Sequence, residues 1–431
     1  PDDRLAKVGS SVLTDDIDDV QTEIPIAEPK WFNQMENNTL KTAQIGRELI
    51  RYGSVSEQAP WRLLGCRRGV YQTRAAAHSK GAAVAKLMDH AYKVFLTDVG
   101  LSQEVARRIA DLFNQTGLMQ ISFDGLEGNW STGMGQYGRT LFVTTWYDHL
   151  RDDLRGRVIT DASNPGHYFW HIYTRMNWGE PWYAGFRESQ TDYRLKNQDY
   201  FRRNLMPCML GWFNMTGQTS PEDIEWLLAR AAGFDAGFAL NTSLGVVREN
   251  GLSETILQAI NAWETARMSG AFSQSQRRRL QDIGQEFHLE ASGSDSWNLY
   301  PVCSSKHTLA QQVQPGQPSE ATWELSNPHE AQPLQFILQV SGGASVGDVT
   351  LEIDNAGEVS VPATLAAGSV LKYAGGRQGI SYDKSWNEIE KVSLEASLLT
   401  VGPGRHSVRF GCRFQTADQP EVKLEFRTIG K

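Results

Sequence analysis

The sequence lacks the features that commit a protein to a membrane, to nucleic acid or to a disulfide framework. It has no apolar run of the roughly 20 residues that a bilayer-spanning helix needs. It has only 4 cysteines, none in Cys-x-x-Cys spacing, so buried thiols are favoured over a disulfide pair and a metal site comes last. Apart from Arg277–Arg279 there is no basic block, and with a net charge of −8 we expect no nucleic-acid partner.

Several catalytic signatures are missing as well. There is no G-x-S-x-G motif, no P-loop and no G-x-G-x-x-G after a strand, so acyl and phosphoryl transfer have little support. His167 and His171 stand four residues apart, but the glutamate of an H-E-x-x-H motif is absent and no third ligand is evident. We therefore expect no metal and no cofactor.

The composition that remains is that of a globular protein with sizeable cores. Apolar residues make up 40% and charged residues 21% of a 431-residue chain, which predicts two or three domains. Thirteen tryptophans are present, and most are expected to pack in cores, while some can stack on sugar rings. The first residues, "PDDRLAKVG", lead us to expect a processed or truncated N-terminus.

The apolar pattern changes along the chain. Loose alternation with glycine punctuation predicts a small β-rich domain or insertion over residues 1–90. Over residues 91–303, apolar runs alternate with helical patterns, which predicts an α/β fold with a (β/α)8-type barrel. Six or seven strands are found rather than eight, and a doubly wound sheet is the alternative. The runs are 92–98, 118–125, 157–164, 205–213, 236–243, 286–292 and 297–302.

Two helical patterns in this region show an apolar face. The first places three apolar residues on one side: Val105, Ile109 and Leu112. The second is expected to begin at Ser220 as N-cap, with Pro221 in the first turn and Glu222 and Asp223 beside the positive end of the helix dipole. Its apolar face has the spacing i, i+3, i+4, i+7 and consists of Ile224, Leu227, Leu228 and Ala231.

The last third of the chain has a different period. Residues 304–321 predict a linker. Over residues 322–431, apolar residues alternate with polar ones between glycine and proline turns, which predicts a β-sandwich. One such strand points four side chains the same way: Leu334, Phe336, Leu338 and Val340.

Polar or aromatic residues stand at the ends of the predicted barrel strands. The loops that follow such strands build the active site of parallel α/β barrels. Any one of these residues could instead cap the next helix, but together they predict a polar, substrate-binding cleft. The strand-end residues are Asp98, Asp124, Asp161, Trp212, Asn241 and Glu290.

The strongest catalytic candidates lie in the stretch "ISFDGLEG". Asp124 directly follows an apolar run, and Glu127 stands three residues later, with glycines that leave space for a ligand. Two carboxyl groups in one loop suit glycosidic bond cleavage, one as nucleophile or base and the other as proton donor. The alternative is that Glu127 only hydrogen-bonds a neighbouring loop.

A second candidate cluster is "RMNWGEPWYAGFRES", residues 175–189. Glu180 is a candidate general acid or base, Trp182 a platform for a sugar ring, and Arg187 a partner for an anionic sugar. Arg187 could instead neutralise Glu180 or Glu188, and the whole segment could be a packed surface loop.

Taken together, "ISFDGLEG" at a strand end, the tryptophan-bearing loops and the C-terminal sandwich resemble the barrel glycoside hydrolases. In the α-fucosidase and α-galactosidase groups, an Asp at the end of the fourth strand is the nucleophile, and the resemblance implies this role for Asp124. The proton donor stays open between Glu127 and Glu180, with Asp161 behind them. Fold analogy alone does not establish activity.

The sequence thus predicts a glycosidase that cleaves a polysaccharide or glycan. A polysaccharide lyase that uses Tyr183, His167 and Arg187 is the first alternative, and a glycan-binding protein without catalysis is the second. We expect a secreted or periplasmic location. The sugar, the anomeric outcome and the oligomeric state are not encoded in any pattern that we find.

Overall fold

The computed structural model describes residues 3–33, 38–123, 126–162, 171–176, 185–189, 192–310, 316–343, 345–354, 357–396, 399–415 and 420–431. The chain divides into two compact units: residues 1–177 with 204–207, and residues 178–203 with 208–431. About 23% of the described structure is helical and 38% lies in strands, so β structure dominates. Within the described residues, no helix is both long and apolar enough to cross a membrane.

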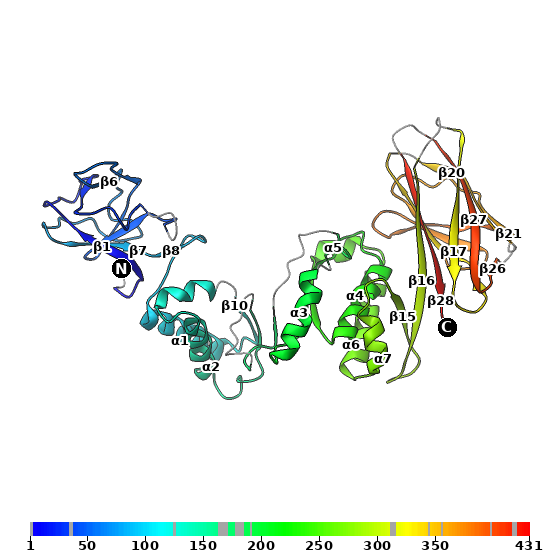
Figure 1. The fold of residues 1–431 in the computed structure, drawn as a ribbon, viewed down its shortest axis with the longest axis horizontal. Coiled ribbons are helices and arrows are strands. Elements are labelled where there is room, and N and C mark those ends of the chain that lie inside the picture. The colour runs from blue at the N-terminus through cyan, green and yellow to red at the C-terminus, as the bar shows by residue number, and fades with distance from the viewer. Residues whose placement is uncertain are drawn as a thin grey trace. The chain divides into compact units, whose positions relative to one another are not determined.

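The first unit begins with short antiparallel strands (blue in Figure 1). They are β1 (Lys7–Val12), β2 (Ile24–Pro25), β3 (Thr42–Ile45), β4 (Glu48–Arg51), β5 (Ser54–Val55), β6 (Arg62–Leu64), β7 (Ala83–Leu87), β8 (Asp89–His90) and β9 (Val94–Phe95). Three sheets result, with strand orders β1-β7-β3-β4, β2-β6-β5 and β8-β9. Their apolar side chains share one core in which Ile24, Ile50 and Val84 are fully buried.

The rest of the first unit combines helices with a small parallel sheet. The elements are α1 (Val99–Thr116), β10 (Gln120–Phe123), the 3-10 helix η1 (Leu126–Thr132), α2 (Tyr137–Asp148), β11 (Ile159–Ala162) and β12 (Arg175–Met176). The sheet has the order β10-β11-β12. Its core centres on the fully buried Trp146, whose ring meets those of Phe113 and Phe123 edge-on at centroid distances of 5.5 and 5.1 Å.

The second unit begins with a helical part. The elements are α3 (Asp192–Arg203), β13 (Met209–Asn214), α4 (Pro221–Phe234), β14 (Gly237–Asn241), α5 (Leu244–Glu249), α6 (Ser253–Met268) and α7 (Gln274–Leu280). Strands β13 and β14 form a parallel pair. Helix α4 packs against α6 and α7, and its predicted apolar face is buried.

Two large antiparallel sheets complete the second unit. The first contains, in order, β15 (Glu286–Ala291), β16 (Trp297–Ala310), β28 (Glu421–Ile429), β19 (Gln335–Ser341), β22 (Val370–Tyr373), β23 (Gln378–Tyr382) and β24 (Glu388–Ser393). The second contains β17 (Pro318–Asn327), β27 (Gly404–Phe414), β20 (Val346–Ile353), β21 (Gly357–Val361) and β25 (Glu395–Ala396). A short pair joins β18 (Gln332–Pro333) and β26 (Thr400–Val401).

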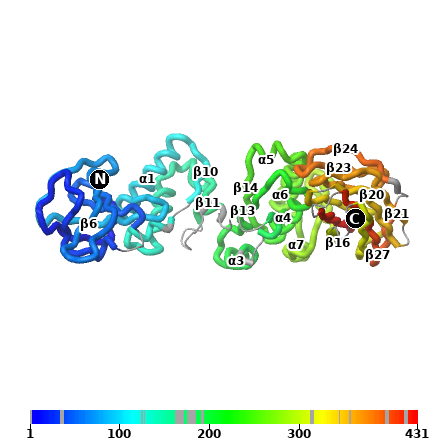
Figure 2. Tube along the Cα trace, turned by 90° about the horizontal axis from the view of Figure 1, so that it is seen from above, coloured from blue at the N-terminus to red at the C-terminus, as the bar shows by residue number. Residues whose placement is uncertain are grey.

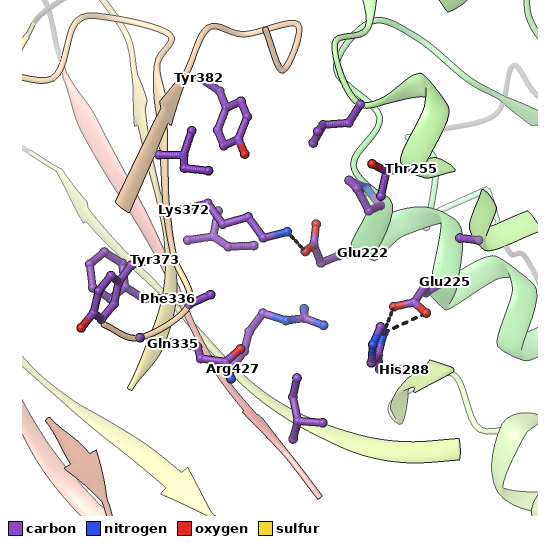
Figure 3. Close-up of a pocket in the computed structure, with 18 of the residues that line it drawn as sticks. Glu222, Glu225, Thr255, His288, Gln335, Phe336, Lys372, Tyr373, Tyr382 and Arg427 are labelled. Atoms are coloured by element: carbon purple, nitrogen blue, oxygen red, sulfur yellow. Dashed lines mark hydrogen bonds and ion pairs between the residues drawn. The ribbon is translucent and has the colours of Figure 1, made fainter. Parts of the chain in front are cut away.

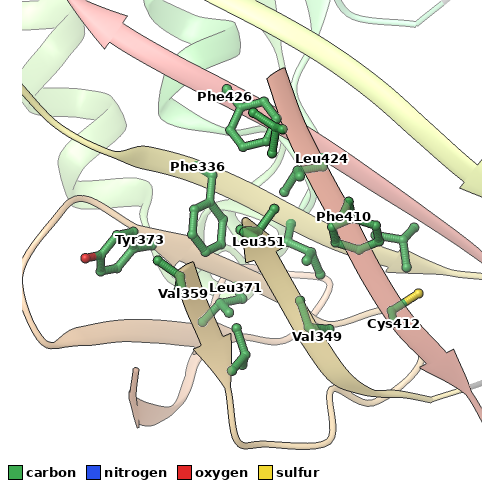
Figure 4. Close-up of a cluster of buried hydrophobic side chains, with 14 of the residues drawn as sticks. Phe336, Val349, Leu351, Val359, Leu371, Tyr373, Phe410, Cys412, Leu424 and Phe426 are labelled. Carbon is green, nitrogen blue, oxygen red and sulfur yellow. The ribbon is translucent and has the colours of Figure 1, made fainter. Parts of the chain in front are cut away.

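The two large sheets share one apolar core. Phe336 of β19 and Phe426 of β28 come from the first sheet, and Leu351 of β20 and Phe410 of β27 come from the second. All four side chains are fully buried, and Figure 4 shows them meeting in one cluster. Because strand side chains alternate between faces, this core accounts for the period-two pattern of the sequence.

The expected (β/α)8-type barrel is wrong. In the described residues, four of the expected strands do pair in parallel, but they form separate sheets of three strands (with β12) and two strands. The runs 286–292 and 297–302 form an antiparallel hairpin instead, and β16 pairs onward with β28. The first run contributes β9, which pairs antiparallel with β8. The error arose because apolar run length does not encode the direction of the partner strand.

The sandwich is attached to the helical part within the second unit. Ser385 Oγ donates to Glu249 Oε1 at 2.9 Å, and Trp386 Nε1 donates to the Gln218 carbonyl at 2.9 Å. Figure 2 shows the corresponding strands β23 and β24 on the side of α5 and α6. The interval 304–321, where a linker is expected, holds the end of β16 and the start of β17, while 311–315 lie outside the described residues. The domain boundaries after residues 90 and 303 stay predictions.

Candidate functional site

The first unit holds the edge from which the strongest predicted catalytic loop departs. In the parallel sheet, Phe123 of β10 pairs with Ala162 of β11, and Ala162 pairs with Met176 of β12. They are the last described residues of the three strands, so the described parts of the strands share one register at this edge. The carboxyl edge of a parallel sheet is where ligands bind in open α/β folds. We call this place the strand-end edge.

Several predicted site residues fall outside what the structure describes. Asp124, Glu180 and Trp182 lie outside the described residues, as do Tyr183 and His167 of the lyase alternative. The backbone of Glu127 belongs to η1, but its side chain is not among those described. The roles of these residues stay predictions.

Two predicted binding residues of the first unit are described. Asp98 is the N-cap of α1, where its Oδ1 accepts from the Leu101 amide at 2.8 Å. It therefore has the capping role that is the alternative to substrate binding. Asp161 lies on β11, and with 2% exposure it is buried one residue before the strand-end edge.

The other described candidates belong to the second unit. The Arg187 guanidinium binds Asp223 Oδ1 and Glu286 Oε1, each at 2.6 Å, while the expected partner Glu180 lies outside the described residues. Trp212 is partly buried on β13. Asn241 ends β14 beside Asn214, and its Nδ2 donates to Asn214 Oδ1 at 3.3 Å. Glu290 lies on β15 and pairs with Lys431 at 2.5 Å.

The second unit also contains a cleft that sequence reasoning missed. It lies between α4, α6 and β15 on one side and strands β19, β22, β23 and β28 of the first large sheet on the other. Its volume is about 620 Å³, within the roughly 300–1,000 Å³ that is typical of small-molecule sites. Figure 3 shows its charged side chains pointing into the space between the helices and the sheet. We call it the α4 cleft.

Two carboxylates reach the α4 cleft from the first two turns of α4. Ser220 Oγ accepts from the Asp223 amide at 3.1 Å, which together with Pro221 fixes where the helix begins. Glu222 and Glu225 are three residues apart, so they share one face of the helix. The helix start was predictable from sequence, but Glu222 was assigned only to the helix dipole and Glu225 was not singled out.

Glu222 forms an ion pair across the cleft. Its Oε1 accepts from Lys372 Nζ of β22. Burial opposes ionisation, but the positive charges of Lys372 and Arg427 outweigh it and lower the pKa of Glu222 to about 2. Glu222 Oε2 is buried and has no hydrogen-bond partner among the described side chains.

Glu225 is held more completely. Its Oε2 lies 2.9 Å from His288 Nδ1, and its Oε1 accepts from Trp263 Nε1 at 3.1 Å and from the Leu289 amide at 3.2 Å. The hydrogen bond to Glu225 raises the pKa of His288 above its usual value of 6.5. Glu225 and His288 thus form a second hydrogen-bonded pair in the wall of the cleft, which is an ion pair when His288 is protonated.

Arg427 of β28 supplies the third set of charges. It binds Glu425 Oε1 at 2.5 Å and Glu286 Oε2 at 3.1 Å, and Glu286 also binds Arg187. The partners Lys372 and Arg427 lie about 150 residues or more beyond α4 in the sequence, and no local pattern links them to it. Such long-range pairs become visible only when the sandwich is placed against the helices of its own unit.

Neither unit shows a metal centre in its described part. Among the described residues there is no group of three or more His, Cys, Asp or Glu side chains that could hold a metal ion. The four cysteines are free thiols, with Cys66 and Cys412 buried. Burial raises the pKa of both of these thiols to about 12, so they are poor nucleophiles.

Comparison with known proteins gives little. No family model matches the chain, and no curated protein matches its sequence. One similar solved structure is the isomalto-dextranase of Arthrobacter globiformis T6 in complex with panose. The two chains are 10% identical, and the match covers 80% of this chain and 74% of that chain with a TM-score of 0.28. A TM-score this low carries no argument about the fold or the activity of this chain.

Proposed function

We propose that the protein acts on glycans as a glycoside hydrolase, with its chemistry at the strand-end edge of the first unit. The observation that supports this best is the parallel register that places Phe123, Ala162 and Met176, the last described residues of β10, β11 and β12, side by side. Asp124 directly follows the last described residue of β10, and Glu127 stands three residues later in the same unit. Residues that follow a strand at the carboxyl edge of a parallel sheet are suited to build a site.

In this proposal two carboxyl groups divide the work. Asp124 attacks the anomeric carbon or activates a water molecule, and Glu127 protonates the departing glycosidic oxygen, while Glu180 stays the alternative donor that the sequence predicts. Their separation decides the stereochemistry, since about 5 Å favours retention and roughly 6.5–9.5 Å favours inversion. Trp182 would stack on a sugar ring.

The lyase alternative has less support from the described residues. It needs Arg187 to neutralise the carboxylate of an acidic sugar. The Arg187 guanidinium already has two carboxylate partners, Asp223 and Glu286, and is only 19% exposed. Recruiting it for substrate would leave Asp223 without the cation that it binds among the described residues, which is costly in a partly buried setting.

The decisive experiment is digestion of a panel of neutral and acidic glycans by the full chain. A hydrolase releases reducing ends without ultraviolet absorbance, a lyase releases unsaturated ends that absorb, and a binding protein releases neither. Absence of reducing ends across the panel would refute the proposed activity.

Substitutions then assign the groups. Asp124→Asn, Glu127→Gln and Glu180→Gln are each compared with Asp152→Asn, since the Asp152 side chain is 96% exposed. Loss of an acid–base group is expected to lower kcat by about 10²–10⁴-fold, while Asp152→Asn changes nothing. A variant that retains full turnover removes its residue from the catalytic set. Trp182→Ala is expected to raise KM more than it lowers kcat.

A further inference from the structure

We propose that the α4 cleft is a second ligand site, formed entirely within the second unit, which binds a neutral molecule rich in hydroxyl groups, such as a short oligosaccharide. This inference does not rest on the activity proposed above. It rests on the volume of the cleft, on one buried carboxylate oxygen without a partner, and on the balance of the surrounding charges.

The walls of the cleft are amphipathic. Apolar surface comes from both sides, and amide and hydroxyl side chains stand among it. The apolar lining includes Leu252, Ala259, Ile337 and Ile380, and the polar lining includes Thr255, Gln258, Gln335 and Gln378. Sugar rings match such walls because they present C–H faces to apolar groups and hydroxyl groups to amides, which both donate and accept.

Glu222 gives the cleft a specific anchor. Its side chain is only 10% exposed, and Figure 3 shows it projecting toward Lys372 in the middle of the space. Lys372 occupies Oε1, but Oε2 is buried without a side-chain partner among the described residues. A buried acceptor without a donor is costly, and a ligand hydroxyl could supply that donor.

The charges around the cleft favour a neutral ligand. Glu222 is paired with Lys372, Glu225 with His288, and Arg427 with Glu286 and Glu425. An anionic or cationic ligand would have to compete with one of these pairs and leave a partly buried charge uncompensated. A polyhydroxylated ligand needs only Glu222 Oε2 as an acceptor and the side-chain amides of the lining as further hydrogen-bond partners.

The test measures binding to the full chain rather than turnover. Maltotriose, cellotriose and chitotriose serve as neutral probes and trigalacturonate as a charged comparator, each titrated calorimetrically. At least one neutral probe is expected to bind more tightly than the charged comparator. Binding by none of the three, or tighter binding of trigalacturonate, overturns the proposal.

Two tryptophan substitutions on α6 locate the site. Ala262 lines the cleft, so Ala262→Trp is expected to fill it and weaken binding at least tenfold. Leu257→Trp adds the same side chain at a position of the same helix that is 55% exposed and outside the cleft lining, and is expected to leave binding unchanged. Binding that survives Ala262→Trp, or is lost equally in both variants, overturns the assignment.

Glu222→Gln keeps the size of the side chain and tests the anchor without relying on a filled cavity. Weakening by about tenfold or more is expected, because hydrogen bonds to charged groups are the stronger ones. Unchanged affinity would contradict the role of Glu222. Ala262→Trp should leave the release of reducing ends unchanged while it weakens probe binding, so failure of the proposed hydrolase and failure of this site give different results.

Discussion

A buried glutamate lies in each unit, and the two are satisfied differently. Glu48 of the first unit is fully buried, and Arg68 binds both of its oxygens at 2.7 and 2.8 Å. His78 and the amides of Gly69 and Ala76 complete its shell. Glu222 of the second unit has Lys372 on one oxygen and no side-chain partner among the described residues on the other.

The difference separates a structural carboxylate from a candidate binding group. Five hydrogen-bond donors leave Glu48 no capacity for a ligand, so its network can only stabilise the fold. We call the part that it stabilises, strands β1 to β9 of the first unit, the β module. Glu222 borders a cleft of about 620 Å³ and keeps one oxygen available. Burial of a charged group therefore indicates function only where its hydrogen-bonding capacity is incomplete.

The largest effect is expected at Glu48. Glu48→Gln keeps the shape of the side chain but leaves the Arg68 guanidinium, whose side chain is only 6% exposed, without its counter-charge. Breaking a buried pair in this way typically costs about 3–5 kcal/mol. We expect the hydrogen-exchange protection of amides in β3 and β4 to fall accordingly.

The matched control is Glu57→Gln, at an exposed position of the same β module. Its effect should stay within about 0.5 kcal/mol. If both variants reduce hydrogen-exchange protection equally, the Glu48 network is not what stabilises the β module. Glu48 could then no longer serve as the structural carboxylate with which Glu222 is compared.

Acid should act on the Glu48 network in a defined direction. Burial raises the pKa of Glu48, but hydrogen bonds from Arg68 and His78 outweigh it and hold the pKa below the usual 4.5. Its stabilisation is therefore present above about pH 4.5 and is lost as the pH falls through the lowered pKa. Protection of β3 and β4 should decline over that acid range in the wild type and be flatter in Glu48→Gln.

A smaller loss is expected at Glu222. Glu222→Gln removes one ion pair at a cleft wall, which predicts a cost of about 1–3 kcal/mol in the second unit. The additional change Lys372→Met should recover part of this cost, because it removes the ammonium group that Glu222→Gln leaves without a counter-charge. Hydrogen exchange in the first turn of α4 measures both. A loss as large as that of Glu48→Gln would show that Glu222 is equally structural.

The sequence predicted local features, such as helix ends and apolar faces, better than it predicted which distant residues contact one another. The N-cap at Ser220 and the apolar face of α4 are as expected, with Ile224, Leu227 and Leu228 buried. In α1 the predicted face is wrong in part: Ile109 packs against the core, but Val105 and Leu112 are 37% and 49% exposed, and the buried side is formed by Ala106, Ala110 and Phe113. Small alanines allow the close packing of α1 and α2, and an apolarity count underrates them.

The sequence did not predict the relative direction of paired strands or the partners of charged side chains. Apolar runs marked β10, β11, β13 and β14, but the same kind of run marked β15, which pairs antiparallel. The strand-end acids were predicted from position alone, and Asp98 turned out to cap a helix. Lys372 and Arg427 meet Glu222 only through the packing of the sandwich on α4. Those contacts depend on the tertiary fold, which local periodicity does not contain.

The smallest expected effect is a titration shift at His288, and it tests whether the cleft charges are paired as described. Glu225 and, at 3.4 Å, Glu290 face the ring. The hydrogen bond that His288 donates to Glu225 raises the pKa of His288 above 6.5. The pair therefore stabilises the fold below that pH, and this stabilisation is lost as the pH rises through the raised pKa. His329 of the same unit is an internal control, because burial lowers its pKa below 6.5. Proton NMR should therefore find that His288 titrates at a higher pH than His329, and Glu225→Gln should lower the pKa of His288 alone.

If His288 titrates at the same pH as His329, or if Glu225→Gln leaves its pKa unchanged, Glu225 has no charged partner. The balance of charges that favours a neutral ligand would then fail, and a cationic ligand would become the better match to the cleft.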